Sequence, residues 1–231
     1  MNTAKFNQFL NQLSESPLQV IDSKISTDRY VPIVLSDKNN DLLKFEISSS
    51  LEWKKYIKLF LEDKNATIAF GGYLEKRNIY DRSKYFKCLG ENKRRNIHLG
   101  MDFWCKEGTK VLAVLDGEIH SFKNNNNYGD YGPTIILKHK IKEEVFYTLY
   151  GHLSLLSIEN LKVGDFFLKG SVIGYLGNSL INGDYAPHLH FQIIKDLENN
   201  YGDYPGVSSK ENIEFYSRNC PNPNLLLKLL I

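Results

Sequence analysis

Short apolar runs, separated by turns rich in glycine or polar residues, dominate the chain from residue 66 to residue 194. The runs fall at residues 67–70, 111–114, 119–122, 133–137, 145–153, 166–168, 172–176 and 187–194. Short apolar runs bounded by turn signals are typical of strands, and no long helical pattern interrupts this series. The pattern predicts a mainly β fold, either an antiparallel β-sandwich or a partly open barrel.

One connection in this series carries a specific turn signal. Asp116-Gly117 lies between the runs at 111–114 and 119–122. Asp-Gly favours the tight turns that join antiparallel strands, so these two runs are expected to form a hairpin.

Residues 1–65 follow a different pattern and contain no histidine. Apolar residues recur at helical spacing over 6–13, and a capping box at 49–52 precedes a second amphipathic segment. Between them, residues 31–35 and 42–47 are expected to be strands joined by a polar turn. We therefore expect a small α+β appendage that is structural or positions the substrate.

The C-terminal segment, residues 201–231, contains three prolines and ends in the apolar run 225–231. An apolar terminus this dense is expected to pack on the domain that precedes it. The chain is thus divided into the N-terminal appendage, a β domain of residues 66–200 and a C-terminal extension.

The composition is that of an ordinary globular protein and gives no electrostatic reason to expect nucleic acid as a partner. The chain has 231 residues, of which 42% are hydrophobic, and a formal net charge of +2. No stretch approaches the roughly 18 apolar residues of a membrane span. The N-terminus lacks the apolar run of a secretory signal, so we expect a cytoplasmic protein; a chain trimmed of its leader would look the same and would act in the periplasm or outside the cell.

The three cysteines, Cys88, Cys105 and Cys220, have no Cys-x-x-Cys spacing. Neither a disulfide framework nor a thiolate metal site is therefore expected.

Two imidazoles lie two residues apart in the apolar run 187–194. On a strand, His188 and His190 share one face, whereas the apolar residues between them serve the other. A pair of surface histidines is the simpler interpretation of this spacing. His98 and Asp102, four residues apart, would also share a face of an extended backbone, and with His190 they would supply the three ligands of a catalytic metal site.

Taken singly, these candidate ligands have simpler interpretations. Asp102 alone could be a turn or cap residue, and His98 alone could be a loop histidine. The remaining histidines have weaker signals. His120 and His139 lie on expected strands without partner spacing, and we take them as structural. His152 lies at the end of the run 145–153, where a turn would place it at the rim of the sheet.

Taken together, these motifs resemble the lysostaphin-type (LytM-like) zinc metallopeptidases over roughly residues 68 to 195. The motifs, in the order of the family, are His98-Leu-Gly-Met-Asp102, Gly108-Thr-Lys-Val-Leu-Ala113, Asp116-Gly-Glu-Ile119, Tyr150-Gly-His-Leu-Ser154, Val163-Gly-Asp165, Ile173-Gly174 and His188-Leu-His-Phe191.

The resemblance implies antiparallel sheets with an open groove, and one zinc ion held by His98, Asp102 and His190. It also implies that His152 and His188 act as catalytic residues on water and on the transition state. All five positions carry the required residue type, so we expect a zinc-dependent amide hydrolase that uses one Zn²⁺ ion.

Three functions remain open at this point. The first is an endopeptidase of peptidoglycan-type peptides, which is the usual activity of the family. The second is a cytoplasmic zinc amidase or peptidase for a small peptide or modified amino acid, because the C-terminal features resemble the peptidase-like modules fused to phosphotransferase and class III aminotransferase domains. The third is a non-catalytic binding module. The sequence predicts neither the bond that is cut nor the oligomeric state.

Overall fold

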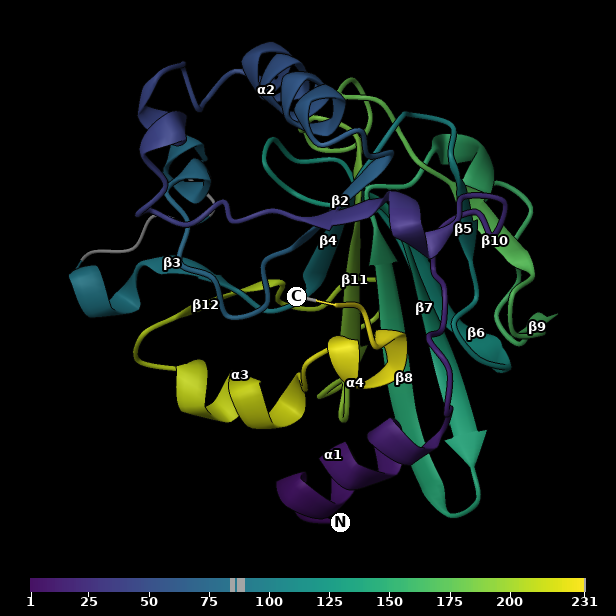
Figure 1. Ribbon diagram of the computed structural model, residues 1–231. Helices are drawn as coiled ribbons and strands as arrows, with labels where there is room; N and C mark the ends of the chain where they lie inside the picture. The colour runs from purple at the N-terminus through teal and green to yellow at the C-terminus, as the bar shows by residue number, and fades with distance from the viewer. Residues whose placement is uncertain (84–85, 87–89, 231) are drawn as a thin grey trace.

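A computed structural model of the protein describes residues 1–83, 86 and 90–230. Its centre is an eight-stranded sheet in the order β1-β2-β4-β11-β8-β7-β6-β9 (Figure 1). In chain order these strands are β1 Tyr30–Pro32, β2 Ile68–Gly71, β4 Met101–Trp104, β6 Gly117–Asn125, β7 Gly132–Ile141, β8 Glu144–Gly151, β9 Phe166–Phe167 and β11 His188–Ile194. Neighbouring strands are antiparallel except β1 and β2. The prediction of a mainly β fold is confirmed, as a large mixed sheet whose described strands do not close into a barrel.

Two small sheets and a few helices complete the described fold. The small sheets are β5 Lys110–Leu112 with β10 Val172–Tyr175, and β3 Arg95–His98 with β12 Val207–Ser209. The α-helices are α1 Thr3–Gln12, α2 Ser50–Asp63, α3 Ile213–Asn219 and α4 Asn224–Leu227. Short 3-10 helices lie at η1 Thr27–Arg29, η2 Asn40–Leu43, η3 Ile79–Arg82, η5 Glu91–Lys93 and η6 Leu155–Ser157.

Both ends of the chain contribute to the hydrophobic core. Leu189, Phe191 and Ile193, from one face of β11, lie in the largest cluster of buried side chains. Phe6 of α1 and Leu226 of α4 are buried in the same cluster, and these two helices lie side by side at the bottom of Figure 1. The terminal segments therefore pack on the β-sheet.

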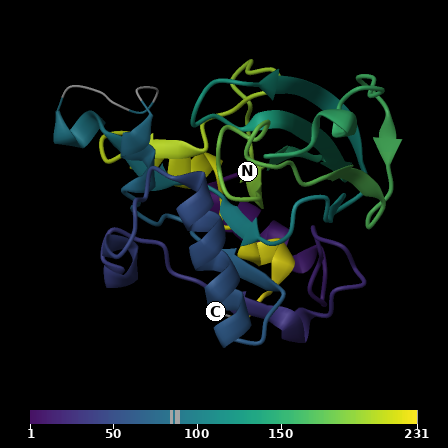
Figure 2. The same ribbon diagram turned by 90° about the horizontal axis from the view of Figure 1, so that it is seen from above.

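The second N-terminal helix packs on the opposite face of the same sheet. Ser49 begins α2, since its hydroxyl accepts a hydrogen bond from the backbone N–H of Glu52. Trp53 and Ile57 of α2 are buried in one cluster with Trp104 of β4. Viewed from above, helix α2, drawn in blue, lies on the side of the molecule away from the long teal strands of the large sheet (Figure 2).

The strand expected at residues 42–47 is not formed. The segment instead contains η2 followed by irregular backbone. Phe45 packs edge-on against Trp53 and is stacked on Tyr56, with ring centroids 5.3 and 5.2 Å apart. Packing of this ring against α2, rather than pairing in a sheet, thus determines the path of the chain.

The expectation of a hairpin around Asp116-Gly117 is also wrong. Strand β5 pairs with β10, whereas β6 pairs with β7 and β9. Asp116 accepts a hydrogen bond from the backbone N–H of Lys169 through its side chain and one from His139 through its carbonyl. This turn therefore connects two different sheets.

None of the helices that the structure describes combines the length and the apolar character needed to cross a bilayer.

Candidate metal centre

The register of strand β11 brings together residues that are far apart in the sequence. His190 is paired with Asp102 on β4 and with Gly151 on β8, and His188 is paired with Trp104. Directly opposed residues in antiparallel strands have Cβ atoms only about 5 Å apart. The central position of β11 thus places the His-x-His motif beside Asp102 on one side and His152 on the other.

His98 reaches the same point from a different sheet. It ends β3, which pairs with β12, whereas Asp102 lies on β4 of the large sheet. The expectation that both lie on one extended strand is therefore wrong, because the chain bends between β3 and β4. Gly100 forms part of this bend, and a Cβ atom there would lie 2.6 Å from the His190 ring. Only glycine allows this close approach.

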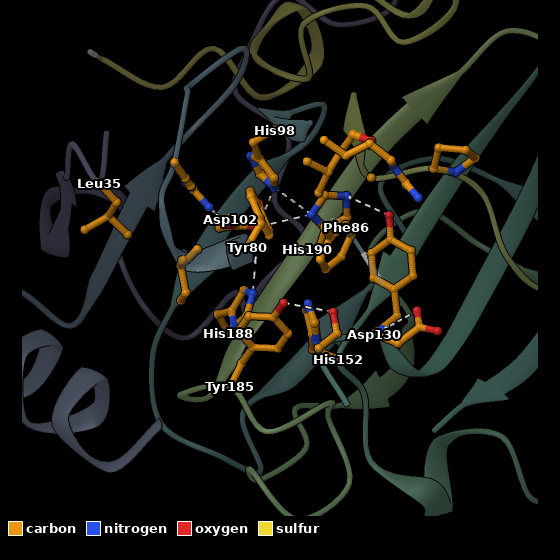
Figure 3. A pocket seen from close by; sticks show the side chains of 18 of the residues that line it. Leu35, Tyr80, Phe86, His98, Asp102, Asp130, His152, Tyr185, His188 and His190 are labelled. Atoms are coloured by element: carbon orange, nitrogen blue, oxygen red, sulfur yellow. Dashed lines mark hydrogen bonds and ion pairs between the residues drawn. The ribbon is translucent and has the colours of Figure 1, made fainter. Parts of the chain in front are cut away.

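Three ligand atoms converge at one point (Figure 3). His98 Nε2 lies 2.8 Å from His190 Nδ1, and each of these nitrogens lies 3.2 Å from Asp102 Oδ1. Ligands at about 2.0–2.1 Å from one tetrahedral zinc ion lie about 3.3 Å apart. The three side chains are at most 3% exposed, so the folded protein holds them in this arrangement.

Both imidazoles have their N–H group directed away from the shared point. His98 Nδ1–H donates to the carbonyl oxygen of Gly72 at 2.9 Å. His190 Nε2–H donates to Oε1 of Gln192 at 2.9 Å, and the amide group of Gln192 donates to the carbonyl of Pro205 at 3.1 Å and to Cys220 Sγ at 3.2 Å. His98 Nε2, His190 Nδ1 and Asp102 Oδ1 therefore direct lone pairs at one another. A bound cation would relieve the repulsion between these lone pairs. The donor set thus fits a metal ion.

A buried ion pair holds the second oxygen of Asp102. Arg77 Nη1 donates to Asp102 Oδ2 at 2.5 Å, and Arg77 Nε donates to Glu75 at 2.6 Å. Burial by itself would raise the pKa of Asp102, but His98 and Arg77 together hold that pKa well below its usual range. Asp102 is therefore a carboxylate whose free oxygen faces His98 and His190.

His152 and His188 face the same point from the other side. His188 Nδ1–H donates to the carbonyl of Ala186 and His152 Nδ1–H to the carbonyl of Asn182, both at 2.8 Å. Each Nε2 is therefore left as a proton acceptor, and His188 Nε2 lies 3.9 Å from Asp102 Oδ1. Burial lowers the pKa of His188 to about 4 and that of His152 well below its usual value, so both rings are neutral near pH 7.

The backbone of His152 is turned out of the strand that precedes it. Its φ of 63° lies in the left-handed region, which is uncommon for residues other than glycine. Hydrogen bonds from its N–H to the carbonyl of Tyr131 and from Gly177 N–H to its own carbonyl hold this conformation. The turn places the ring 4.2 Å from that of His188, as measured between the ring centroids.

The centre opens into a pocket of about 170 Å³. Side chains from three parts of the chain line it: Leu35 and Trp53 come from the N-terminal segment, Tyr131 from the β domain and Val207 from the C-terminal extension. The prediction of a groove therefore has its counterpart in a pocket that the N-terminal segment partly covers.

The other candidate residues lie away from the centre. His139 is buried, with Nδ1–H donating to Asp116 and Nε2 2.7 Å from Thr148 Oγ1. His120 lies on β6 beside Ser121. Cys105 and Cys220 are buried free thiols, and Cys88 lies outside the described residues.

Sequence reasoning missed Arg77, Gln192 and Trp104. Gln192 and Trp104 each lie two residues along a strand from a predicted ligand, on the same face, so strand alternation could have indicated both. Arg77 lies in the long polar connection between residues 72 and 96, and no spacing rule connects it to Asp102. Five residues of that connection, 84–85 and 87–89, lie outside the described residues.

Comparison with known proteins identifies relatives of the central part of the chain. Residues 96–202 match the model of peptidase family M23. Lysostaphin of Staphylococcus staphylolyticus is 34% identical over 110 residues, which are 47% of this chain and 21% of that protein. The DD-carboxypeptidase/endopeptidase Mpg of Neisseria meningitidis serogroup B is 35% identical over 96 residues, 42% of this chain and 20% of that protein. The chain thus spans about a fifth of the length of these relatives.

A solved structure is also similar to part of the chain. The catalytic domain of lysostaphin from Staphylococcus simulans is 30% identical, with 56% of this chain and 85% of that chain covered and a TM-score of 0.37.

Proposed function

Because residues 96–202 match the model of peptidase family M23, we propose that this protein is a zinc-dependent metallopeptidase that hydrolyses an amide bond in peptides of the peptidoglycan type. The observation that carries the proposal is the convergence of His98, Asp102 and His190 on one point, with two neutral imidazoles facing it. Three ligands leave a fourth position of a tetrahedral ion open, which is typical of catalytic rather than structural zinc sites.

Each side chain of the centre has a role in this proposal. When bound, a zinc ion supplies Lewis acidity, which lowers the pKa of water and polarises a carbonyl group. His188 and His152, whose Nδ1 hydrogens are held by backbone carbonyls, offer Nε2 as the proton acceptor for the attacking water. The one nitrogen that accepted this proton then returns it to the leaving amine. Burial keeps both rings neutral, which is the form that this role needs.

The choice of a peptidoglycan-type peptide rests on the relatives. Mpg is named a DD-carboxypeptidase/endopeptidase, and a protein of Staphylococcus capitis that is 35% identical over 109 residues is named a glycyl-glycine endopeptidase. Peptides with small side chains are therefore the first substrates to test.

A small peptide or modified amino acid is the second candidate substrate. It is favoured by the pocket of about 170 Å³, which Leu35 and Trp53 of the N-terminal segment help to enclose. A short molecule enters such a pocket more easily than a cross-linked polymer does.

A cleavage assay tests the function and separates the two substrates. The zinc-loaded protein is incubated with purified cell walls and, separately, with a panel of short peptides, and the products are identified by mass. We expect new amino groups that do not appear with a chelator or with His188→Ala. Release only from cell walls supports the first substrate, and release only from short peptides supports the second. If the zinc-loaded protein cleaves neither, the peptidase function is rejected.

A further inference from the structure

Arg82, the last residue of η3, joins the N-terminal segment to the loop of residues 177–187. Its side chain is 2% exposed. Nη2 donates to the carbonyls of Gly183 at 3.2 Å and Asp184 at 2.6 Å, and Nη1 donates to the carbonyl of Ser48 at 3.2 Å. A guanidinium group presents its donors in a rigid fork, so this one buried side chain holds two successive peptide groups of the loop in a fixed orientation.

The same loop binds the two imidazoles that face the metal centre without belonging to its ligand set. The carbonyl of Asn182 accepts the Nδ1 hydrogen of His152, and the carbonyl of Ala186 accepts that of His188, each at 2.8 Å. In the chain, the two peptide groups that the guanidinium binds lie between these two acceptors. A shift of the backbone there would therefore displace both acceptors and weaken both hydrogen bonds.

The middle of the loop has a backbone conformation that depends on its surroundings. Gly183 and Asp184 both lie in the left-handed region, with φ of 83° and 64°. A residue other than glycine keeps such a conformation only where neighbouring contacts impose it. Ser50 Oγ donates to Asp184 Oδ1 at 2.6 Å, and Gly129 N–H donates to the Gly183 carbonyl at 3.0 Å. Together with Arg82, these contacts determine the path of the loop.

The guanidinium also contacts an aromatic ring that packs on both imidazoles. Its central carbon lies 4.1 Å from the centroid of the Tyr185 ring, which is a cation–π contact. The Tyr185 ring meets those of His152 and His188 edge-on, with centroids 5.1 and 5.7 Å apart (Figure 3). Arg82 thus supports the two histidines both through the backbone of the loop and through this ring.

We propose that Arg82 is a positioning residue for the two histidines. By fixing the backbone of loop 177–187, it keeps the Nδ1 hydrogens of His152 and His188 bound and their Nε2 atoms directed at the metal centre. The inference rests on the proposed peptidase function and goes beyond it, because turnover then depends on a residue that precedes residues 96–202, the stretch matched by the family model.

The ligand set should be insensitive to this residue. The hydrogen bonds that orient the three ligands come from Gly72, Arg77 and Gln192, which lie outside loop 177–187. Loss of the Arg82 guanidinium should therefore disturb the proton acceptors and leave the zinc site intact. This separation distinguishes a positioning role from general support of the fold.

Substitution of Arg82 tests the effect on turnover of whichever substrate the cleavage assay identifies. A displacement of about 1 Å in the reacting groups can cost about 100-fold in rate, so Arg82→Met should lower kcat about 10- to 100-fold. KM should stay within about threefold, since the lost interaction acts in the transition state. Arg82→Lys keeps the charge but not the fork, and its kcat should be intermediate. Arg94→Met, which removes an arginine bound to Asp81, is the matched control and should not change kcat.

A second measurement does not depend on cleavage. The full-length, zinc-loaded protein is labelled with ¹⁵N-histidine, and solvent exchange of the ring N–H hydrogens is followed by NMR. In Arg82→Met, those of His152 and His188 should exchange about tenfold faster or more, because their acceptors are no longer fixed. Those of His98 and His190 should be unchanged, and one equivalent of zinc should remain bound. If circular dichroism shows that Arg82→Met is unfolded, Arg82→Lys is judged by the same criteria.

The two readouts separate this inference from the proposed function. Unchanged exchange at His152 and His188, or unchanged kcat, overturns the positioning role even if the protein cleaves peptides. Loss of zinc with faster exchange at all four rings also overturns it, because Arg82 would then support the fold as a whole. Faster exchange confined to His152 and His188 supports the role, even if no peptide is cleaved and the peptidase function is rejected.

Discussion

Arg77 Nη1 lies 2.5 Å from Oδ2 of Asp102, and both side chains are buried. One carboxylate oxygen is thus held by a guanidinium, while the other faces His98 and His190. Glu75, which bonds to Arg77, also accepts the backbone N–H of Leu35 at 2.8 Å. The N-terminal segment is therefore connected to the metal centre through a continuous series of hydrogen bonds.

We predict that Arg77→Met weakens metal binding about 10- to 100-fold, since this is the usual effect of losing a group that orients a metal ligand. The free energy of unfolding should also fall by about 3–5 kcal/mol, because the Asp102 charge is left buried and unpaired. Competition with a chromogenic chelator and urea unfolding measure the two effects. The neighbouring Lys76→Met, which removes an exposed ion pair with Asp37, is the control and should change neither. Unchanged metal affinity in Arg77→Met would contradict the orienting role.

The five residues of the centre should fall into two classes when replaced by alanine. Variants of His98, Asp102 and His190 should lose stoichiometric zinc, because two ligands do not hold the ion. Variants of His152 and His188 should retain zinc and lose about 10²–10⁴-fold in turnover, the usual contribution of a general base. Metal analysis and the peptide assay measure the two properties. Full zinc retention by His98→Ala would reject the ligand assignment, and His120→Ala should behave as the unchanged protein.

Gln192 should matter for zinc affinity although it does not touch the ion. Its Oε1 accepts the Nε2 hydrogen of His190, which fixes the ring so that Nδ1 faces the ligand point. Gln192→Leu removes this acceptor and should weaken zinc binding about 10- to 100-fold. The exposed Gln8→Leu serves as the control for a Gln-to-Leu change. A zinc affinity that is equal in the two variants would show that the hydrogen bond to Gln192 does not orient the ring.

His139 should make stability depend on pH outside the metal centre. Burial lowers its pKa in the folded protein to about 4, from 6.5. The unfolded chain therefore binds this proton more readily, so the contribution of His139 to stability is complete above about pH 6.5 and is lost as the pH falls to about 4. The loss amounts to about 3 kcal/mol.

Urea unfolding of the wild-type protein and of His139→Gln, both with chelator, isolates this effect. The difference between their unfolding free energies should shrink by that amount between pH 7 and pH 4. A constant difference over this range would mean that the imidazole titrates normally in the folded state.

The strands that surround the site could be predicted from the sequence, but their neighbours in the sheet could not. Alternation along residues 188–194 places His188 and His190 on one face, and the structure agrees. The register that opposes His190 to Asp102 depends on the packing of both faces of β11, and no local pattern encodes it. Asp116-Gly117 illustrates the limit, because its turn signal is correct but the strands on either side of it pair with other strands.

The sequence predicts which residue types form the candidate site. Contacts between residues that are far apart in the chain complete it. His98, Asp102 and His190 could be named because their types and spacing match a metal-ligand pattern. Arg77 could not, because an arginine in a polar connection is almost always solvated, and only the fold shows that this one is 4% exposed. Trp53 lies 51 positions from Trp104, its stacking partner, and the amphipathic pattern that follows residues 49–52 does not indicate this contact.

The bend that separates β3 from β4 determines how much of the chain a shortened fragment must contain. His98 is paired with Val207 of β12, the Pro205 carbonyl and Cys220 support Gln192, and Gly72 accepts the His98 hydrogen. A gene fragment trimmed to residues 96–202 would encode every ligand but none of these supports. The smallest piece worth expressing therefore begins before Gly72 and extends beyond Cys220.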